Sequence, residues 1–177
     1  MQCVYRVGVR MRWFVSVLAV AITASVWGCT IDPGANFEVP LSVFNEDFFY
    51  CHVEPEYLFA QQTQCGAGQA SDNGNCHFNA SAVSGMALQN HTLINCGGGD
   101  HPLPNDPNGV AATGPGSPAA NNFSSASLEM SRECQDYDTC QAAILKRPTS
   151  TTDHPRQIFL PTDPTLPNVI YQWAATP

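Results

Sequence analysis

Three residues near the middle of the sequence, Cys65, Cys76 and His77, carry side chains that bond metals and carbon electrophiles. In the pattern C-x-x-C-H, two thiols form thioether bonds to haem vinyl groups, and the histidine next to the second cysteine bonds the iron. Here Cys76 and His77 are adjacent as that chemistry requires, but ten residues separate the two cysteines. The three residues are therefore candidates for covalent haem attachment, with His77 as the candidate metal ligand.

A haem iron in a cytochrome takes a second axial ligand, and the sequence offers several. We predict Met130, which follows His77 by 53 positions, a plausible distance for a ligand that reaches the opposite face. Met86 is only nine positions after His77, which is too near. Three histidines are alternatives: His91, His101 and His154.

A disulfide is the competing interpretation for Cys65 and Cys76, since a loop of this length closes without strain and such a bridge adds about 2–4 kcal/mol. Six cysteines follow Cys29: Cys51, Cys65, Cys76, Cys96, Cys134 and Cys140. Sequence alone does not choose among their pairings. Cys134 and Cys140 suit one disulfide or two separate bridges, with Cys51 and Cys96 as the natural remaining pair. Haem attachment would leave four of these cysteines, enough for two disulfides. Without haem, all six would be available for three disulfides.

Several short motifs surround these residues in a fixed order: an acidic-Pro segment at 53–58, Cys65, Cys76-His77, a Gly-x-x-Leu turn at 85–88, His154-Pro155, Asp163-Pro164 and Ile-x-x-Trp at 170–173. This order resembles that of the small c-type cytochrome-like domains carried by bacterial exported lipoproteins. The resemblance implies a small helical domain that holds haem c through Cys65, Cys76 and His77. It implies electron transfer with a redox protein partner, and no enzymatic activity.

The elements that must position these residues are predicted to be helices joined by long irregular loops. Breakers and apolar periodicity predict four features. They are a helix from Pro55 to about 62, a polar Gly/Pro-rich excursion over 97–122, a helix over 124–146 and a last helix from 164 through 174. Leu166, Ile170 and Trp173 share one face of the last helix. The sequence thus predicts a mainly α, disulfide-stapled domain over 44–177.

The amino terminus has the pattern of an export signal. Arg6, Arg10 and Arg12 precede an uncharged run over 13–27, which is shorter than the about 20 apolar residues of a membrane-spanning helix. The run ends Val-Trp-Gly-Cys, which resembles the lipobox of bacterial lipoproteins and implies lipidation of Cys29. We therefore predict a signal peptide over 1–28, a lipid-anchored tether over 29–43 and a location in the bacterial cell envelope. The outer membrane is favoured because Thr30, rather than Asp, follows Cys29.

Charge limits the partners of the exported part. The leader contains three of the seven basic residues and none of the fifteen acidic ones, so residues 29–177 carry a formal charge of −11. Such a surface repels nucleic acid and suits a cationic partner. No hydrolase, metalloprotease or phosphate-binding motif is present. The alternative to a haem protein is a haem-less, disulfide-stapled envelope lipoprotein with a binding or structural role; a secreted enzyme is a third, weaker interpretation.

Overall fold

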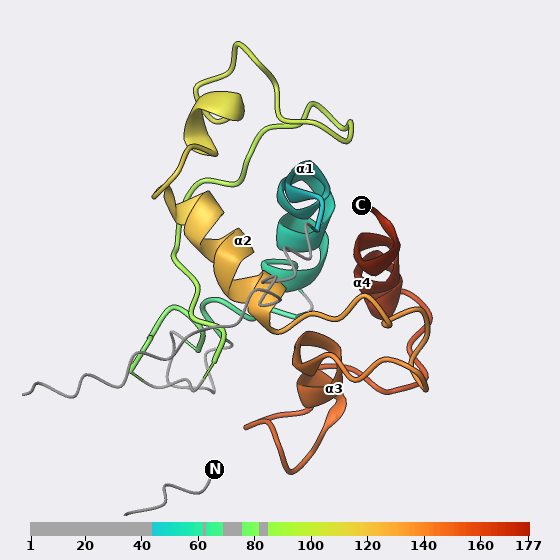
Figure 1. The fold of residues 1–177 in the computed structure, drawn as a ribbon. Helices are drawn as coiled ribbons and strands as arrows, with labels where there is room; N and C mark the ends of the chain where they lie inside the picture. Colours follow the sequence, from blue (N-terminus) through green and yellow to red (C-terminus); the bar gives the residue numbers. More distant parts are fainter. Residues whose placement is uncertain (1–43, 62, 69–75, 82–84) are drawn as a thin grey trace, which may run out of the picture. The chain divides into compact units, whose positions relative to one another are not determined.

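The computed structural model describes residues 44–61, 63–68, 76–81 and 85–177, all within one compact unit, Pro40–Pro177. The predicted signal peptide, tether and lipidated Cys29 lie outside the described residues. The elements are α1 (Glu46–Phe48), the π-helix η1 (Phe49–Leu58), the 3₁₀ turn η3 (Val110–Ala112), α2 (Pro118–Leu128), α3 (Ala143–Thr149) and α4 (Leu166–Ala175) (Figure 1). No strand occurs in these ranges, which confirms the predicted mainly α class.

The first helical segment begins nine residues before the predicted start at Pro55. Asn45 caps α1 by accepting a hydrogen bond from the backbone N–H of Phe48 at 2.8 Å, and acidic residues in the first turn suit the helix dipole. Pro55 therefore lies inside η1 rather than at a helix start. Because proline has no N–H to donate, an α-helix would be broken there. The wider π-type turn spans it with bonds between residues five apart, such as Phe59 N–H to Glu54 O at 2.8 Å.

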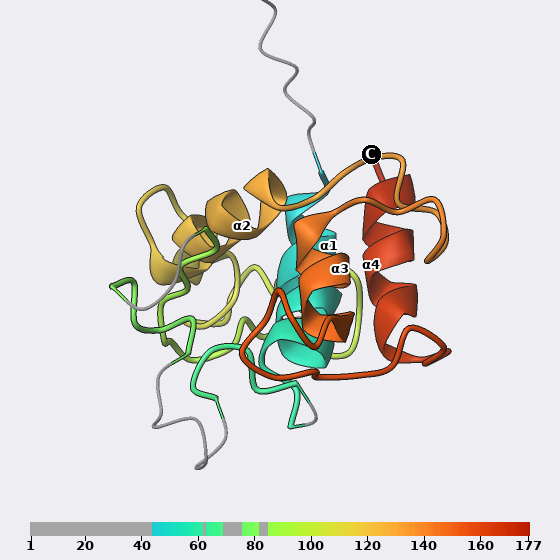
Figure 2. The ribbon, with the colours of Figure 1, turned by 90° about the horizontal axis from the view of Figure 1, so that it is seen from below.

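The core forms around η1, which lies between α2 and α4 (Figures 1 and 2). Five of its apolar or aromatic residues are buried: Phe49, Tyr50, Val53, Tyr57 and Leu58. The ring of Trp173 packs on Phe49 and Phe44, with ring centroids 5.2 and 5.1 Å apart. Ile170 and Trp173 of α4 are completely buried and Leu166 is partly buried, so the predicted apolar face of the last helix is confirmed.

The predicted helix over 124–146 is wrong. In its place, α2 begins at Pro118, where Ser117 accepts a hydrogen bond from Ala120 N–H at 3.1 Å, and α3 begins only at Ala143. The chain between them holds the Cys134–Cys140 disulfide, whose Cα atoms are 3.9 Å apart. An α-helix would separate residues six apart by about 9 Å, so this disulfide and a continuous helix exclude each other. Because α2 starts at Pro118, the excursion predicted through residue 122 is irregular only in its first part.

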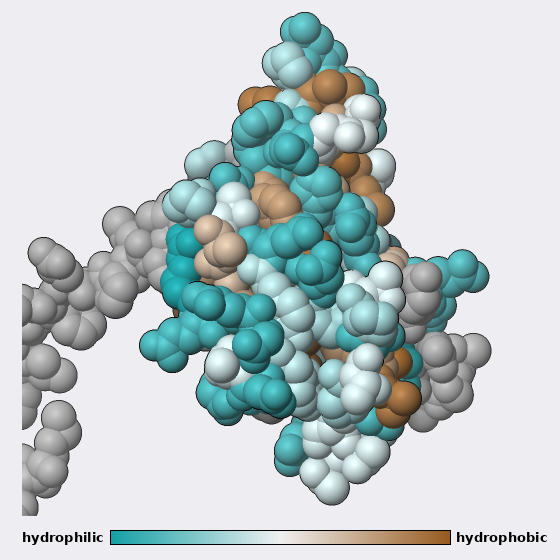
Figure 3. Space-filling view, turned by 90° about the vertical axis from the view of Figure 1, so that its right-hand side faces the viewer, coloured by the Kyte–Doolittle hydropathy of each residue, from teal (hydrophilic) through white to brown (hydrophobic). Residues whose placement is uncertain are grey.

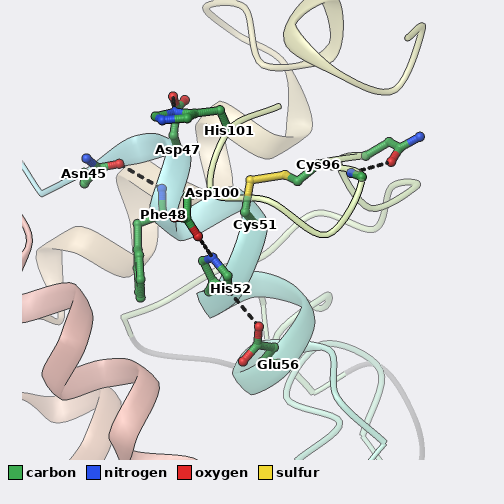
Figure 4. The surroundings of a disulfide bond; sticks show 11 residues. Asn45, Asp47, Phe48, Cys51, His52, Glu56, Cys96, Asp100 and His101 are labelled. Carbon is green, nitrogen blue, oxygen red and sulfur yellow. Dashed lines mark hydrogen bonds and ion pairs between the residues drawn. A yellow bond between two sulfur atoms is a disulfide. The ribbon is translucent and has the colours of Figure 1, made fainter. Parts of the chain in front are cut away.

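Both disulfide pairs considered from the sequence, Cys51–Cys96 and Cys134–Cys140, are present. Cys51–Cys96 joins η1 to the start of the excursion, and Figure 4 shows a polar cluster around it. The ring of His52 contacts Glu56 and Asp100, each at 2.8 Å, and His101 contacts Asp47 at 2.7 Å. Burial lowers the pKa of His52, but the two carboxylates outweigh this effect and raise it. The excursion is therefore held to η1 covalently and electrostatically.

The surface seen in Figure 3 is largely hydrophilic, with small and separate apolar areas. None of the helices in the described ranges is both long and apolar enough to cross a membrane.

A buried carboxylate connects η1 to two other segments. Glu54 is completely buried, and its Oε1 accepts hydrogen bonds from His91 Nε2–H at 2.9 Å and Asn122 Nδ2–H at 2.8 Å. The other nitrogen of His91 lies 2.7 Å from the carbonyl oxygen of Thr92, so each ring nitrogen faces an acceptor, an arrangement that favours the protonated imidazole. The hydrogen bond to Glu54 raises the pKa of His91, against the opposing effect of partial burial.

This pair predicts a pH-dependent stability. Because the folded-state pKa of His91 is raised above 6.5, its contribution is complete below that pH and is lost as pH rises through the folded value. We expect the free energy of unfolding, measured with denaturant from pH 6 to pH 9, to fall with pH. Glu54→Gln should cost about 1–3 kcal/mol at pH 6 and flatten this dependence. The control is His101→Gln, which alters an exposed pair; a Glu54→Gln profile parallel to the unsubstituted chain would contradict the assignment.

Candidate functional site

The fold brings Cys65 next to Cys76 and His77 despite the ten residues between the cysteines. After η1 the chain turns back, and Cys65 N–H donates to Leu58 O at 2.9 Å. Two backbone hydrogen bonds then pair the segments: His77 N–H to Cys65 O at 3.1 Å and Phe78 N–H to Gly66 O at 3.0 Å. The three predicted residues therefore form one local group.

The imidazole of His77 is held in a defined tautomer. Its Nδ1–H donates to the carbonyl oxygen of Met86 at 2.5 Å, and its own carbonyl accepts from Leu88 N–H at 2.8 Å. A carbonyl only accepts, so the proton of the neutral ring is on Nδ1 and Nε2 keeps its lone pair. Burial lowers the pKa of His77, although the hydrogen bond to Met86 opposes this effect. A neutral imidazole with its Nδ1–H bound to a backbone carbonyl is the form in which histidine binds a metal through Nε2.

The two cysteines differ in exposure. Cys65 is a free, buried thiol, and burial raises its pKa to about 12. Cys76 is half-buried. Only the thiolate is a strong nucleophile, so burial of Cys65 disfavours its reaction in the folded chain.

Cys65 borders a small cavity of about 30 Å³, room for about one water molecule, and Cys76 is not among the residues that line it. Cys65, His77 and Met86 contribute to its wall, and Ile144 and Pro148 of α3 add apolar surface. His154 lines the same cavity from the connection between α3 and α4.

The cavity wall also contains one ion pair, in which Arg147 lies 3.8 Å from Glu129. The lining is thus mainly apolar, with two imidazoles, a thiol and this ion pair.

The other residues considered as axial ligands lie at different positions in the fold. Met130 is partly buried against the core and does not line the cavity, so the structure does not bring it to His77. His91 pairs with Glu54 and His101 with Asp47, both away from the cavity. Met86, considered too near along the chain, lines the cavity and binds His77 through its carbonyl. No residue-type signal could have indicated that role, because any residue supplies a carbonyl.

The comparisons with known proteins add no assignment: no protein-family model, curated protein or solved structure matches the chain. In the parts of the chain that the structure describes, no three or more His, Cys, Asp or Glu side chains gather as ligands of a metal ion. The candidate site therefore depends on the local geometry around His77.

The close pairing at Cys65 predicts a strict requirement for glycine at position 66. A Cβ atom there would collide with the ring of Phe78, which packs edge-on against Phe59. We expect Gly66→Ala to lower the free energy of unfolding by about 1–3 kcal/mol, as overpacking does. Gly114→Ala is the matched control, because a Cβ atom there meets open space. Equal stability of the two variants, measured by denaturant unfolding, would contradict the pairing.

Proposed function

We propose that this chain is an exported, lipid-anchored protein that holds haem c and transfers electrons. Cys65 and Cys76 would hold the haem through thioether bonds, and His77 would bind its iron. The bound haem would supply reversible one-electron exchange. The chain's own residues attach and orient it and exclude water from it.

One observation carries the proposal: the backbone pairing of 65–66 with 77–78 brings the two cysteines and His77 together. In C-x-x-C-H this proximity follows from short spacing, whereas here the backbone pairing supplies it. Cys65 and a His77 imidazole with its Nδ1 bound to a carbonyl line one small cavity, and Cys76 precedes His77 in the chain.

Attachment requires only the thiols and the vinyl groups. Each thioether would join a cysteine sulfur to one vinyl carbon, with the thiol proton on the other carbon, so no electrons would be gained or lost. Because Cys65 is buried in the folded chain, attachment would precede closure of the core. The two disulfides use the other four cysteines and leave Cys65 and Cys76 for this reaction.

A haem-less, disulfide-stapled envelope lipoprotein is the second candidate. The same proximity of Cys65 and Cys76 favours it, because two neighbouring thiols in an oxidising compartment form a disulfide. That chain would have a binding or structural role, and the cavity at His77 would be its ligand site.

We further propose the bacterial cell envelope as the location, with lipid on Cys29 as the anchor and the outer membrane favoured. The charge of −11 over residues 29–177 suits a cationic redox partner.

The haem proposal is tested by expression of the full chain in a bacterium with a cytochrome c maturation system. We expect haem that stays with the polypeptide in a denaturing gel and a sharp reduced α-band. Cys65→Ala and Cys76→Ala should each remove one thioether, and the double variant should lose all covalent haem. The matched control is the Cys134→Ser/Cys140→Ser double variant, which alters a disulfide outside the cavity and should retain covalent haem.

A chain without covalent haem, in which Cys65 and Cys76 resist alkylation until reduced, would overturn the haem proposal. The same result would support the haem-less lipoprotein.

The anchor is tested independently with Cys29→Ser. We expect the unsubstituted chain in the membrane fraction, labelled by a radioactive fatty acid, and the variant without label. Each buried methylene of the lipid contributes about 0.8 kcal/mol, so loss of the chains should release the protein. Thr30→Ser is the control; unchanged labelling of Cys29→Ser would contradict the anchor.

A further inference from the structure

One segment of the chain is held to the helices mainly by polar contacts. Residues 97–117, which we call the strap, run from the disulfide at Cys96 to the start of α2 and include the turn η3. Pro102 is the only side chain of the strap that is buried, and Leu103 and Val110 are exposed. A segment with so little apolar burial opens at a low cost in free energy.

Both ends of the strap contain glycines whose backbone conformation favours this residue. Gly97 and Gly98 have φ angles of +61° and +80°, and Gly116 has a φ angle of +80°. Glycine has no Cβ atom, so the backbone changes conformation there with little steric hindrance. Between these ends the strap is bonded to itself, for example from Val110 N–H to Leu103 O at 3.1 Å. The strap therefore has the features of a unit that moves about two hinges.

A single histidine connects the strap to η1. His52 lies between two carboxylates, with Nδ1 2.8 Å from Glu56 and Nε2 2.8 Å from Asp100 (Figure 4). Glu56 is on η1 itself, whereas Asp100 belongs to the strap. The ring of Phe48 packs on the imidazole, with centroids 4.7 Å apart. Burial lowers the pKa of His52, but the hydrogen bonds to the two carboxylates, the charged groups that face it, raise it overall.

Only a protonated imidazole satisfies both contacts of His52. A neutral ring has one N–H, so its other nitrogen would point a lone pair at a carboxylate. Glu56 is fixed on the same helix, whereas Asp100 is highly exposed and lies on the hinged strap, so the contact to Asp100 is the one that opens. The contact of His101 with Asp47, at 2.7 Å, weakens in the same direction when His101 becomes neutral.

We propose that protonation of His52 closes the strap onto η1 and that its deprotonation opens the strap. Deprotonation leaves Asp100 beside Glu56 with no cation between them, so repulsion between the carboxylates adds to the loss of the hydrogen bond. The disulfide keeps one end of the strap attached, so the opening is local. The open strap exposes the acidic surface of α1 and η1. This inference is independent of haem attachment, because none of these residues lines the cavity at His77.

Cleavage of the full chain by thermolysin tests this inference, because the protease cuts before accessible apolar residues such as Val110. A peptide of residues 95–118 is the reference at each pH, since it corrects for the pH dependence of the protease. Because the pKa of His52 is raised above 6.5, the strap is closed below that pH and opens as pH rises through the folded value. We expect relative cleavage about two- to fivefold faster at pH 8.5 than at pH 6. Cleavage before Ile170, which is buried, reports global unfolding, and the increase at Val110 should occur without it.

Three variants separate this switch from a purely structural contact. His52→Gln and Asp100→Asn should be cut at the faster rate at both pH values. His52→Lys keeps a positive charge at both values, so the strap should stay closed and its pH response should disappear. Glu133→Gln is the matched control, because Glu133 is an exposed carboxylate outside the strap, and it should behave as the unsubstituted chain does.

Equal relative cleavage of the unsubstituted chain at the two pH values would overturn the proposal. A His52→Lys variant that opens with pH as the unsubstituted chain does would also overturn it. If the His52 variants do not accumulate, Asp100→Asn decides, because Asp100 is exposed and its substitution leaves the core intact. A pH response of Asp100→Asn equal to that of the unsubstituted chain would then overturn the assignment.

Discussion

Burial of the helical segment 46–58 within one small core is the constraint on which the rest of the structure depends. This segment has no long apolar partner, so several short elements cover it, each by a different interaction. Cys51 bonds Cys96, Glu54 pairs with His91 and Asn122, and Tyr57 donates its hydroxyl to the carbonyl of Ile144 at 2.7 Å. A small domain buries a smaller fraction of its apolar surface than a large one. Disulfides and buried polar contacts therefore add stability that a larger hydrophobic core would otherwise supply.

The same segment organises the candidate site. Its carboxyl end receives the turn that carries Cys65, through the hydrogen bond from Cys65 to Leu58, and the backbone pairing then adds Cys76 and His77. Tyr57 and Leu58 also line the cavity, so part of its wall belongs to this segment. Because the site consists of turns attached to one buried element, its geometry depends on backbone hydrogen bonds more than on regular secondary structure.

The proposed chemistry depends on how His77 is held. Its imidazole gives the Nδ1–H to the carbonyl of Met86, and the neutral ring keeps the Nε2 lone pair. The thiol of Cys65 is buried where solvent and oxidants reach it poorly. The net charge of −11 over residues 29–177 suits the proposed cationic partner, because charge complementarity accelerates encounter.

The sequence by itself determined the mainly α class, the buried face of α4 and the chemical types at the site, because apolar periodicity and residue identity are local properties. The cysteine pairs Cys51–Cys96 and Cys134–Cys140 were also predictable, the second as one of two options. Only the tertiary structure decided that Pro55 lies inside a helix, that the Cys134–Cys140 bridge interrupts the predicted 124–146 helix, and that His154 rather than Met130 shares a cavity with His77. These features depend on contacts between residues far apart in the chain, and such contacts leave no periodic or compositional signal in a single sequence.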